Sequence, residues 1–185
     1  MRLILASGSP RRKELLSKEG YSFEIILADV DEKDKELGNL KADELVKVLS
    51  KEKAEYVATT HTDDVVLGAD TIVELGGKIL GKPADYEDAV KMLSEMQGRW
   101  HNVYTGVTIC HKGESNTFVV QSSVKFHPLS VEQIRGYLDK HNVLDKAGAY
   151  GIQDGMVVET YKGSYTNIVG LPMKKVKEEL NKYGV

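Results

Sequence analysis

The sequence predicts an α/β protein with a mixed, twisted β-sheet and flanking helices. Short apolar runs alternate with segments of helical periodicity early in the chain, which is typical of parallel βαβ units. Further along, glycine-containing turns join pairs of strand-like runs, which indicates antiparallel hairpins. With 185 residues, 41% of them hydrophobic and 29% charged, the composition is that of a globular protein, and we expect a single domain over residues 1–185.

The first two elements follow from a clear boundary. The apolar run at residues 3–6 predicts a strand, because it stops at the turn-forming segment Ser7-Gly8-Ser9-Pro10. Ser9 can cap a helix, and Pro10 suits the first helical position, so we expect a helix over residues 10–19.

The remaining elements follow from the same kinds of pattern. Apolar or alternating runs predict strands at residues 23–28, 64–69, 72–75, 78–80, 103–110, 117–125, 157–160 and 165–169. The turns that would join the hairpins are Gly76-Gly77, Lys112-Gly113 and Lys162-Gly163. Helical spacing or a cap predicts helices within residues 41–58, at 86–96 after Asp85, at 131–140 after the capping box Ser130/Gln133, and after residues 170–172.

Charge and cysteine content exclude several classes of protein. The net charge is −3, so no global positive field would hold a nucleic-acid polymer. The single Cys110 cannot form an intrachain disulfide, and no Cys/His cluster indicates zinc. No apolar stretch approaches the ~20 residues of a membrane span, and the first apolar run is too short for a signal peptide. We therefore expect a cytoplasmic protein that binds neither nucleic-acid polymers nor membranes.

Several familiar motifs are missing. Residues 76–83 resemble the GxxxxGK[ST] loop, but Pro83 follows Lys82 where Ser or Thr is required. The sequence also lacks GxGxxG after a strand, HExxH and GxSxG. These absences disfavour P-loop ATPases, Rossmann dehydrogenases, zincins and serine hydrolases.

The first candidate site is the segment Ser7-Gly8-Ser9-Pro10-Arg11-Arg12. A strand that runs into a helix N-terminus offers free backbone N–H groups and the positive end of the helix dipole. Arg11 and Arg12 add positive charge, which opposes that dipole unless an anion is bound. The segment indicates a phosphate site, with a solvated helix start as the alternative.

The second candidate is Asp70, which directly follows a predicted buried strand. Ligands of open α/β sheets bind at the carboxyl ends of strands, and a carboxylate there can hold a divalent cation and accept a proton from water. The alternative is a turn aspartate that caps its own backbone. Glu32 lies in the charged stretch at residues 29–36, and charge runs of this kind are usually solvated faces.

Two lysines are further candidates. Lys53 lies close to the apolar side of its predicted helix, which is unusual for an ammonium group that has no anionic partner. Lys82 stands between Gly81 and Pro83, which restrict its local geometry, although most lysines in loops are simply solvated.

The last candidate is the small-residue loop at residues 145–153. Its glycines and alanines would let a planar ligand lie against the backbone, and Gln153 offers both a donor and an acceptor for the amide edge of a base. The alternative is a tightly packed connection. Local cations, carboxylates and this loop together suit a metal–polyphosphate substrate.

The blocks at residues 3–12, 68–71, 81–83, 145–153 and 169–172 closely resemble the Maf family of nucleoside triphosphate pyrophosphatases. The resemblance implies a sheet fold related to the inosine triphosphatases, with two lobes around a cleft. It also implies a cation-dependent hydrolysis, with Mg²⁺ or Mn²⁺, of a nucleoside triphosphate to the monophosphate and pyrophosphate. Family members are cytoplasmic and often homodimeric.

The resemblance also implies roles for particular residues. Asp70 matches the family's catalytic acid, and Arg11, Thr71 and Gln153 match positions that distinguish the dTTP/UTP branch from the 7-methyl-GTP branch. We expect Glu32 and Asp70 to hold the cation. The groups expected to bind the phosphates are Ser7, Arg12, Lys53 and Lys82.

Two other functions stay open from the sequence. One is a pyrophosphatase for another nucleotide, such as 7-methyl-GTP, inosine triphosphate or a modified pyrimidine triphosphate. The other is a non-catalytic nucleotide-binding regulator of cell division. The presence of every expected charged position favours the enzyme.

Overall fold

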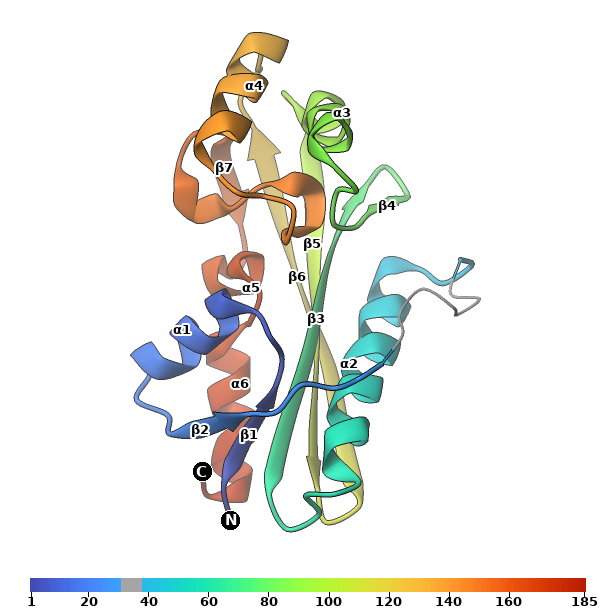
Figure 1. Ribbon diagram of the computed structural model, residues 1–185, viewed down its shortest axis with the longest axis vertical. Helices are drawn as coiled ribbons and strands as arrows, with labels where there is room; N and C mark the ends of the chain where they lie inside the picture. Colours follow the sequence, from blue (N-terminus) through green and yellow to red (C-terminus); the bar gives the residue numbers. More distant parts are fainter. Residues whose placement is uncertain (31–37) are drawn as a thin grey trace. The chain divides into compact units, whose positions relative to one another are not determined.

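The computed structural model describes residues 1–30 and 38–185, and its strands form one mixed sheet (Figure 1). The strand order is β2-β1-β3-β5-β6-β7, with β4 pairing with β3. The strands are β1 (Leu3–Ala6), β2 (Phe23–Ile25), β3 (Val65–Leu75), β4 (Lys78–Leu80), β5 (Trp100–His111), β6 (Glu114–Phe126) and β7 (Val158–Lys162). β1 is parallel to β2 and β3, whereas β4 and β7 run antiparallel to their partners. The predicted mixed α/β sheet is confirmed.

Three of the helices, α1, α3 and α4, begin where the sequence places their caps. They are α1 (Pro10–Lys18), α2 (Ala42–Ala58), α3 (Tyr86–Met96), α4 (Val131–Lys140), α5 (Tyr165–Val169) and α6 (Met173–Leu180), with short 3₁₀ turns η1 (Ala147–Ala149), η2 (Ile152–Asp154) and η3 (Asn181–Tyr183). The Ser9 side chain caps α1, Asp85 caps α3, and Ser130 forms the predicted capping box with Gln133. In the described part of the chain, none of the helices has the length and apolar character that a membrane crossing requires.

The chain divides into two compact units. The first comprises Met1–Thr71, Thr105–Val120 and Gly170–Val185, and the second comprises Ile72–Tyr104 and Gln121–Val169. The long strands β3, β5 and β6 therefore contribute residues to both units.

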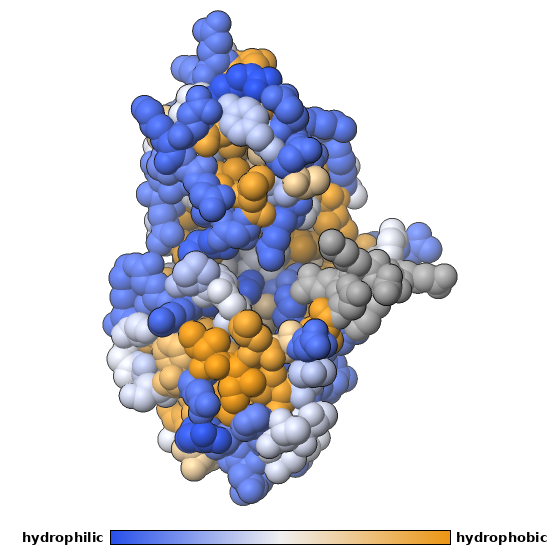
Figure 2. All heavy atoms as spheres, in the orientation of Figure 1, coloured by the Kyte–Doolittle hydropathy of each residue, from blue (hydrophilic) through white to orange (hydrophobic). Residues whose placement is uncertain are grey.

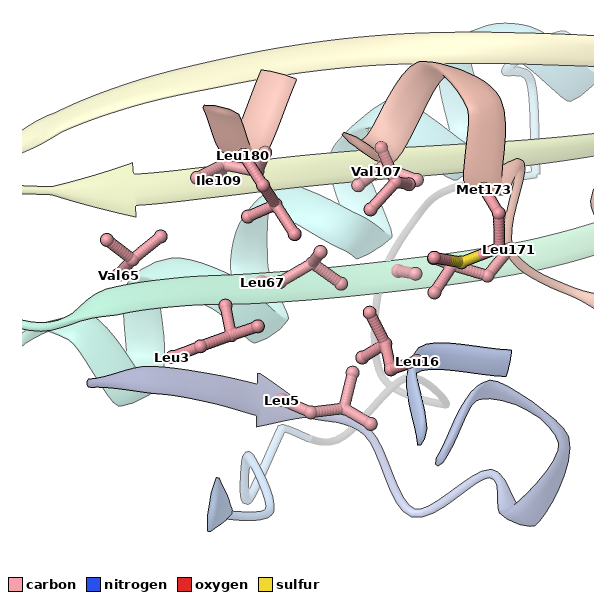
Figure 3. Close-up of a cluster of buried hydrophobic side chains, with 12 residues drawn as sticks. Leu3, Leu5, Leu16, Val65, Leu67, Val107, Ile109, Leu171, Met173 and Leu180 are labelled. Atoms are coloured by element: carbon pink, nitrogen blue, oxygen red, sulfur yellow. The ribbon is translucent and has the colours of Figure 1, made fainter. Parts of the chain in front are cut away.

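The core of the first unit explains the continuous apolar runs of β1 and β3. On one face of these strands, Leu5 and Leu67 pack with side chains of β5, α1 and the segment of α6 (Figure 3). On the opposite face, Ile4 and Val66 pack against Ala54 of α2. A strand that is buried on both faces lacks the apolar–polar alternation of a half-exposed strand.

The surface at the edge strand β2 carries a patch of exposed apolar side chains. In Figure 2 apolar surface gathers over β2 and the segment that follows it, where Ile25 is 40% exposed and Leu27 is 62% exposed. Among the described strands, β2 pairs with β1 at the edge of the sheet. Its residues, Phe23–Ile25, cover only part of the strand predicted at residues 23–28.

Two predicted elements are wrong. β3 does not end before Asp70 but runs on to Leu75, so Asp70 and Thr71 lie within a strand rather than in a turn. The parallel pairing with β1 ends at Gly68, after which the β-forming residues of β3 continue toward the hairpin with β4. Asp70 therefore lies two residues beyond the end of the pairing with β1, but still within β3.

Residues 165–169 form the helix α5 instead of the second strand of a hairpin. The Ser164 hydroxyl accepts the N–H of Asn167 at 3.1 Å, and the Ser164 carbonyl accepts the N–H of Ile168 at 3.3 Å. A serine cap therefore starts a helical turn in a segment whose β-branched and aromatic residues favour a strand.

Candidate active site

The structure places most of the predicted site residues in the first unit. Ser7, Arg11, Arg12, Lys53, Asp70 and Thr71 belong to the first unit, and Lys82 and Gln153 belong to the second. Glu32 lies outside the described residues. Each unit has its own set of contacts around these side chains.

Arg12 is a buried arginine at the start of α1, only 9% exposed. Its Nε donates to the carbonyl oxygen of Gly170 at 2.7 Å, Nη1 donates to Ser7 Oγ at 3.0 Å, and Nη2 donates to Thr71 Oγ1 at 3.0 Å. These three hydrogen bonds fix the orientation of the guanidinium plane at the start of α1, and a planar group of donors in a fixed orientation is suited to binding a phosphate.

Thr71 connects this arginine to the strand β5. Its Oγ1 lies 2.8 Å from the Oγ1 of Thr105, which is fully buried. The predicted specificity residue Thr71 and the predicted phosphate-binding residue Arg12 thus share a hydrogen bond. The role of Thr105 has no sequence signal, because a threonine within a strand belongs to no motif. Gly170 lies in the family-like block at residues 169–172, but the contact of its carbonyl oxygen with Arg12 is visible only in the structure.

Asp70 and Lys53 form an ion pair in the first unit. Lys53 Nζ donates to Asp70 Oδ1 at 2.8 Å, and the two side chains are 18% and 14% exposed. This contact confirms that a lysine close to the apolar side of α2 has an anionic partner. Charges this poorly solvated need such a partner, since desolvation of an isolated ion costs several kcal/mol.

The close approach of α2 to β3 makes this pair possible. A Cβ atom added to Gly68 would lie 2.6 Å from the Ser50 carbonyl oxygen and 2.7 Å from the Ala54 nitrogen. Only glycine lets the helix backbone come this near to the strand. Gly68 therefore holds Lys53 of the helix within reach of Asp70, two residues further along the strand.

Arg11 differs from its neighbour in exposure. Arg12 is buried, whereas Arg11 is half-buried. The two consecutive arginines of α1 thus have different surroundings.

The second unit holds Lys82 and the small-residue loop together. The N–H of Gly148 donates to the carbonyl oxygen of Gly81 at 3.0 Å, so the loop that carries Gln153 is tied to the residue before Lys82. Lys82 and Gln153 are both exposed. Gly148 has a φ of 70°, and a Cβ atom there would lie 2.9 Å from Val73 Cγ2, so this position requires glycine.

In the described part of the first unit, Asp70 is the predicted ligand that could bind a divalent cation. Within residues 1–30 and 38–185, no group of three or more His, Cys, Asp or Glu side chains is arranged to hold a metal ion. Asp70 offers one carboxylate. Mg²⁺ is commonly bound by one or two carboxylates together with substrate phosphates and water, so a single protein carboxylate is compatible with it.

A groove of about 680 Å³ lies elsewhere in the first unit. Its lining includes Arg2, Tyr21, Phe23 and Val185, and none of the predicted site residues that the structure describes. It therefore has no part in the candidate active site.

Comparison with known proteins decides the family. The model of the family described as Maf-like protein matches residues 2–183. The chain belongs to the Maf family. A Maf relative from Carboxydothermus hydrogenoformans is 45% identical over 188 residues, with 100% of both chains covered, and is named "dTTP/UTP pyrophosphatase". A second relative, from Halalkalibacterium halodurans, bears the same name and is 44% identical, covering 98% of this chain and 96% of its own.

Among solved structures, a nucleoside-triphosphatase named dITP/XTP pyrophosphatase from Mycobacterium abscessus aligns with this Maf protein. The TM-score is 0.39 at 13% sequence identity, covering 68% of this chain and 73% of that chain.

Proposed function

We propose that this Maf protein hydrolyses dTTP and UTP to the nucleoside monophosphate and pyrophosphate. The observation that carries the proposal is the arrangement around two adjacent residues of β3. Asp70 is paired with Lys53, and Thr71 is hydrogen-bonded to Arg12. The carboxylate that pairs with Lys53 and the hydroxyl that accepts a hydrogen bond from Arg12 thus belong to consecutive residues of β3. Relatives at 42–45% identity named as dTTP/UTP pyrophosphatases give the proposal its substrate.

In this proposal Asp70 acts as the general base. Its carboxylate orients a water molecule and accepts a proton from it as the water oxygen attacks the α-phosphorus. The bond between the α-phosphorus and the bridging oxygen then breaks, and pyrophosphate leaves with the bonding electrons. The hydrogen bond from Lys53 Nζ holds the Asp70 carboxylate in position for this step.

The phosphate-binding groups in the proposal are Ser7, Arg12, Lys53 and Lys82. Positive groups that are already oriented stabilise the charge that develops on the leaving pyrophosphate, at little cost of reorganisation. The three bonds that fix Arg12 match this requirement.

Asp70 and Glu32 would hold Mg²⁺ or Mn²⁺. When bound, such a cation neutralises phosphate charge and polarises the phosphoryl oxygens. The hard oxygen donors of carboxylates suit both ions.

Base choice is assigned to Arg11, Thr71 and Gln153. Thymine and uracil share an edge of two carbonyls that flank an N–H group, and a glutamine amide can donate to and accept from such an edge. Cytosine replaces one carbonyl with an amino group, which would leave polar groups of the pocket unpaired.

A pyrophosphate-release assay over the common nucleoside triphosphates tests the proposal. With Mg²⁺ or Mn²⁺ present we expect rapid release from dTTP and UTP and slow release from CTP and the unmodified purine nucleotides, with loss of activity in EDTA. A preference for 7-methyl-GTP, inosine triphosphate or a modified pyrimidine nucleotide would change the substrate. Tight nucleotide binding with no turnover would indicate a non-catalytic regulator instead.

The expected setting of the enzyme is a homodimer in the cytoplasm. Sedimentation or light scattering at assay concentrations measures the oligomeric state, and cell fractionation measures the location.

A further inference from the structure

The hydroxyl group of Tyr137 contacts the loop of Gln153 at two points. Tyr137 lies on α4 and its side chain is fully buried. Its Oη accepts the N–H of Gly151 at 3.0 Å and donates to Asp154 Oδ2 at 2.5 Å. Gly151 stands two residues before Gln153, and Asp154 stands one residue after it. One phenol oxygen therefore joins the two sides of the segment that presents Gln153.

The donor and acceptor roles in this contact are fixed by chemistry. A backbone N–H of Gly151 can only donate, so the Tyr137 oxygen must accept, and its single hydrogen is left for the Asp154 carboxylate. Burial, together with the hydrogen bond to Asp154, raises the pKa of Tyr137, so the hydroxyl keeps its hydrogen at neutral pH.

The surroundings leave little space for the loop to relax. The ring of Tyr137 stacks on the ring of His141 with centroids 4.9 Å apart, and His141 Nδ1 lies 3.5 Å from Asp154 Oδ1. A Cβ atom on Gly151 would lie 3.1 Å from Asp154 Oδ2 and 3.3 Å from Lys146 Cε.

Gln153 is exposed on the turn η2, and hydrogen bonds of Gly151 and Asp154 hold this turn on both sides. Within η2, Ile152 is buried at 8% exposure whereas Gln153 is exposed. On the other side of the loop, Tyr150 Oη lies 2.7 Å from His101 Nε2, and the ring of Tyr150 packs edge-on against Phe126. The exposed amide thus projects from a segment whose neighbours are anchored in the interior of the second unit.

We propose that Tyr137 is a positioning residue for base selection, acting through its hydrogen bonds to Gly151 and Asp154 to set the place of Gln153. The inference rests on the proposed function, because it concerns the preference for dTTP and UTP. An unbraced glutamine would sample several positions and would lose part of its discrimination between uracil and cytosine.

The variant Tyr137→Phe removes the hydroxyl and keeps the ring. Tyr86→Phe is the matched control, because the Tyr86 hydroxyl also donates to an aspartate, Asp139 Oδ1 at 2.9 Å, but this hydrogen bond joins α3 to α4 and not α4 to the loop of Gln153. The measurement is the ratio of kcat/KM for UTP to kcat/KM for CTP. We expect Tyr137→Phe to lower this ratio by about tenfold, the size of effect that one lost hydrogen bond gives, and Tyr86→Phe to leave it unchanged.

Two further variants separate positioning from general stability. Asp154→Ala removes one of the two bonds to the Tyr137 hydroxyl and should lower the ratio in the same direction. Combining Tyr137→Phe with Gln153→Ala should give a ratio no lower than Gln153→Ala alone, because both changes act on one interaction. Equal losses for UTP and CTP in Tyr137→Phe would overturn the proposal, since a structural defect lowers all substrates together.

Hydrogen exchange distinguishes failure of this inference from failure of the proposed function. The Gly151 amide should exchange at least about tenfold faster in Tyr137→Phe than in the wild type or in Tyr86→Phe. Unchanged exchange overturns the positioning role even in an enzyme that prefers UTP. A wild type that releases pyrophosphate from neither dTTP nor UTP overturns the proposed function and the assignment to base selection with it, whatever the exchange result.

Discussion

At the scale of single residues, the ion pair of Asp70 and Lys53 serves both the fold and the proposed mechanism. Each side chain is less than one-fifth exposed, so the pairing compensates for poor solvation. The hydrogen bond from Lys53 Nζ also fixes the position of the Asp70 carboxylate, and a general base has to be positioned in this way. One interaction therefore stabilises the fold and positions a proposed catalytic group.

The variant Asp70→Asn should lose turnover while it stays folded. The asparagine keeps the shape and one acceptor oxygen, but it cannot take a proton from water. Loss of general-base assistance costs about 10²–10⁴-fold in rate. Turnover of UTP is measured together with the thermal unfolding midpoint. Asp63→Asn, an exposed aspartate just before β3, is the matched control, and wild-type turnover in a folded Asp70→Asn protein would remove Asp70 from the mechanism.

The variants Arg12→Lys and Arg12→Ala should show whether Arg12 supports catalysis through its positive charge alone or also through the geometry of its guanidinium group. A lysine keeps the positive charge but cannot bond Ser7, Thr71 and Gly170 at once, as the planar guanidinium group does. We expect a lower kcat and a higher KM for both variants, with Arg12→Lys between the wild type and Arg12→Ala. Steady-state kinetics with UTP measures both parameters. A change in KM alone would reduce Arg12 to a ground-state binding group.

The charged residues of the candidate site could be predicted from the sequence more readily than the groups that orient them. An ammonium group near an apolar helix face implies a partner, and the structure shows that partner to be Asp70. The carbonyl of Gly170 and the hydroxyl of Thr105 could not be predicted, because each acts through a contact between segments far apart in the chain.

At the scale of elements, the site depends on how closely α2 lies against β3. The strand presents Asp70 and the helix presents Lys53, so a small shift of the helix changes the distance between the two charges. Gly68 controls this distance, because the backbone of α2 occupies the space that a side chain at this position would need.

The variant Gly68→Ala should therefore destabilise the fold and lower activity together. The added Cβ would meet backbone atoms of Ser50 and Ala54, which cannot rotate away. Overpacking of this kind costs about 1–3 kcal/mol of unfolding free energy. Gly136→Ala is the control, since it lies within α4 with nothing within 4 Å of the added Cβ and should be neutral or slightly stabilising. Chemical denaturation measures both, and equal stability of the two variants would contradict the close-packing argument.

Element boundaries were predictable where a local signal decides them. The caps at Ser9, Asp85 and Ser130 act within one turn of helix, and all three helices begin as predicted. The error at Asp70 arose because an acidic residue usually ends a strand, whereas here partners on neighbouring strands keep β3 extended. Such pairing is long-range information that a local pattern does not contain.

At the scale of the whole molecule, His101 and Glu179 are among the described groups that make stability depend on pH. Burial lowers the pKa of His101 to about 4 from 6.5, so the unfolded chain binds more protons and stability falls as the pH drops from 6.5 to 4. Hydrogen bonds from Lys175 and Lys182 lower the pKa of Glu179 to about 2 from 4.5, so a second loss occurs as the pH drops from 4.5 to 2.

The variant Glu179→Gln should remove the loss of stability that Glu179 causes between pH 4.5 and pH 2, and should leave the loss that His101 causes between pH 6.5 and pH 4. Thermal unfolding midpoints measured from pH 7 to pH 2 would show a lower midpoint for the variant at pH 7 and a flatter curve below pH 4.5. Parallel curves for the variant and the wild type below pH 4.5 would show that Glu179 does not contribute to acid unfolding.

The central claim, that water attacks the α-phosphorus of UTP or dTTP, is tested most directly by hydrolysis in ¹⁸O-labelled water. Mass spectrometry of the products then locates the oxygen that came from the solvent. The proposed mechanism predicts one ¹⁸O atom in the nucleoside monophosphate and none in the pyrophosphate, with this reaction lost in Asp70→Asn. Label in the pyrophosphate, or formation of the nucleoside diphosphate and orthophosphate, would contradict attack at the α-phosphorus.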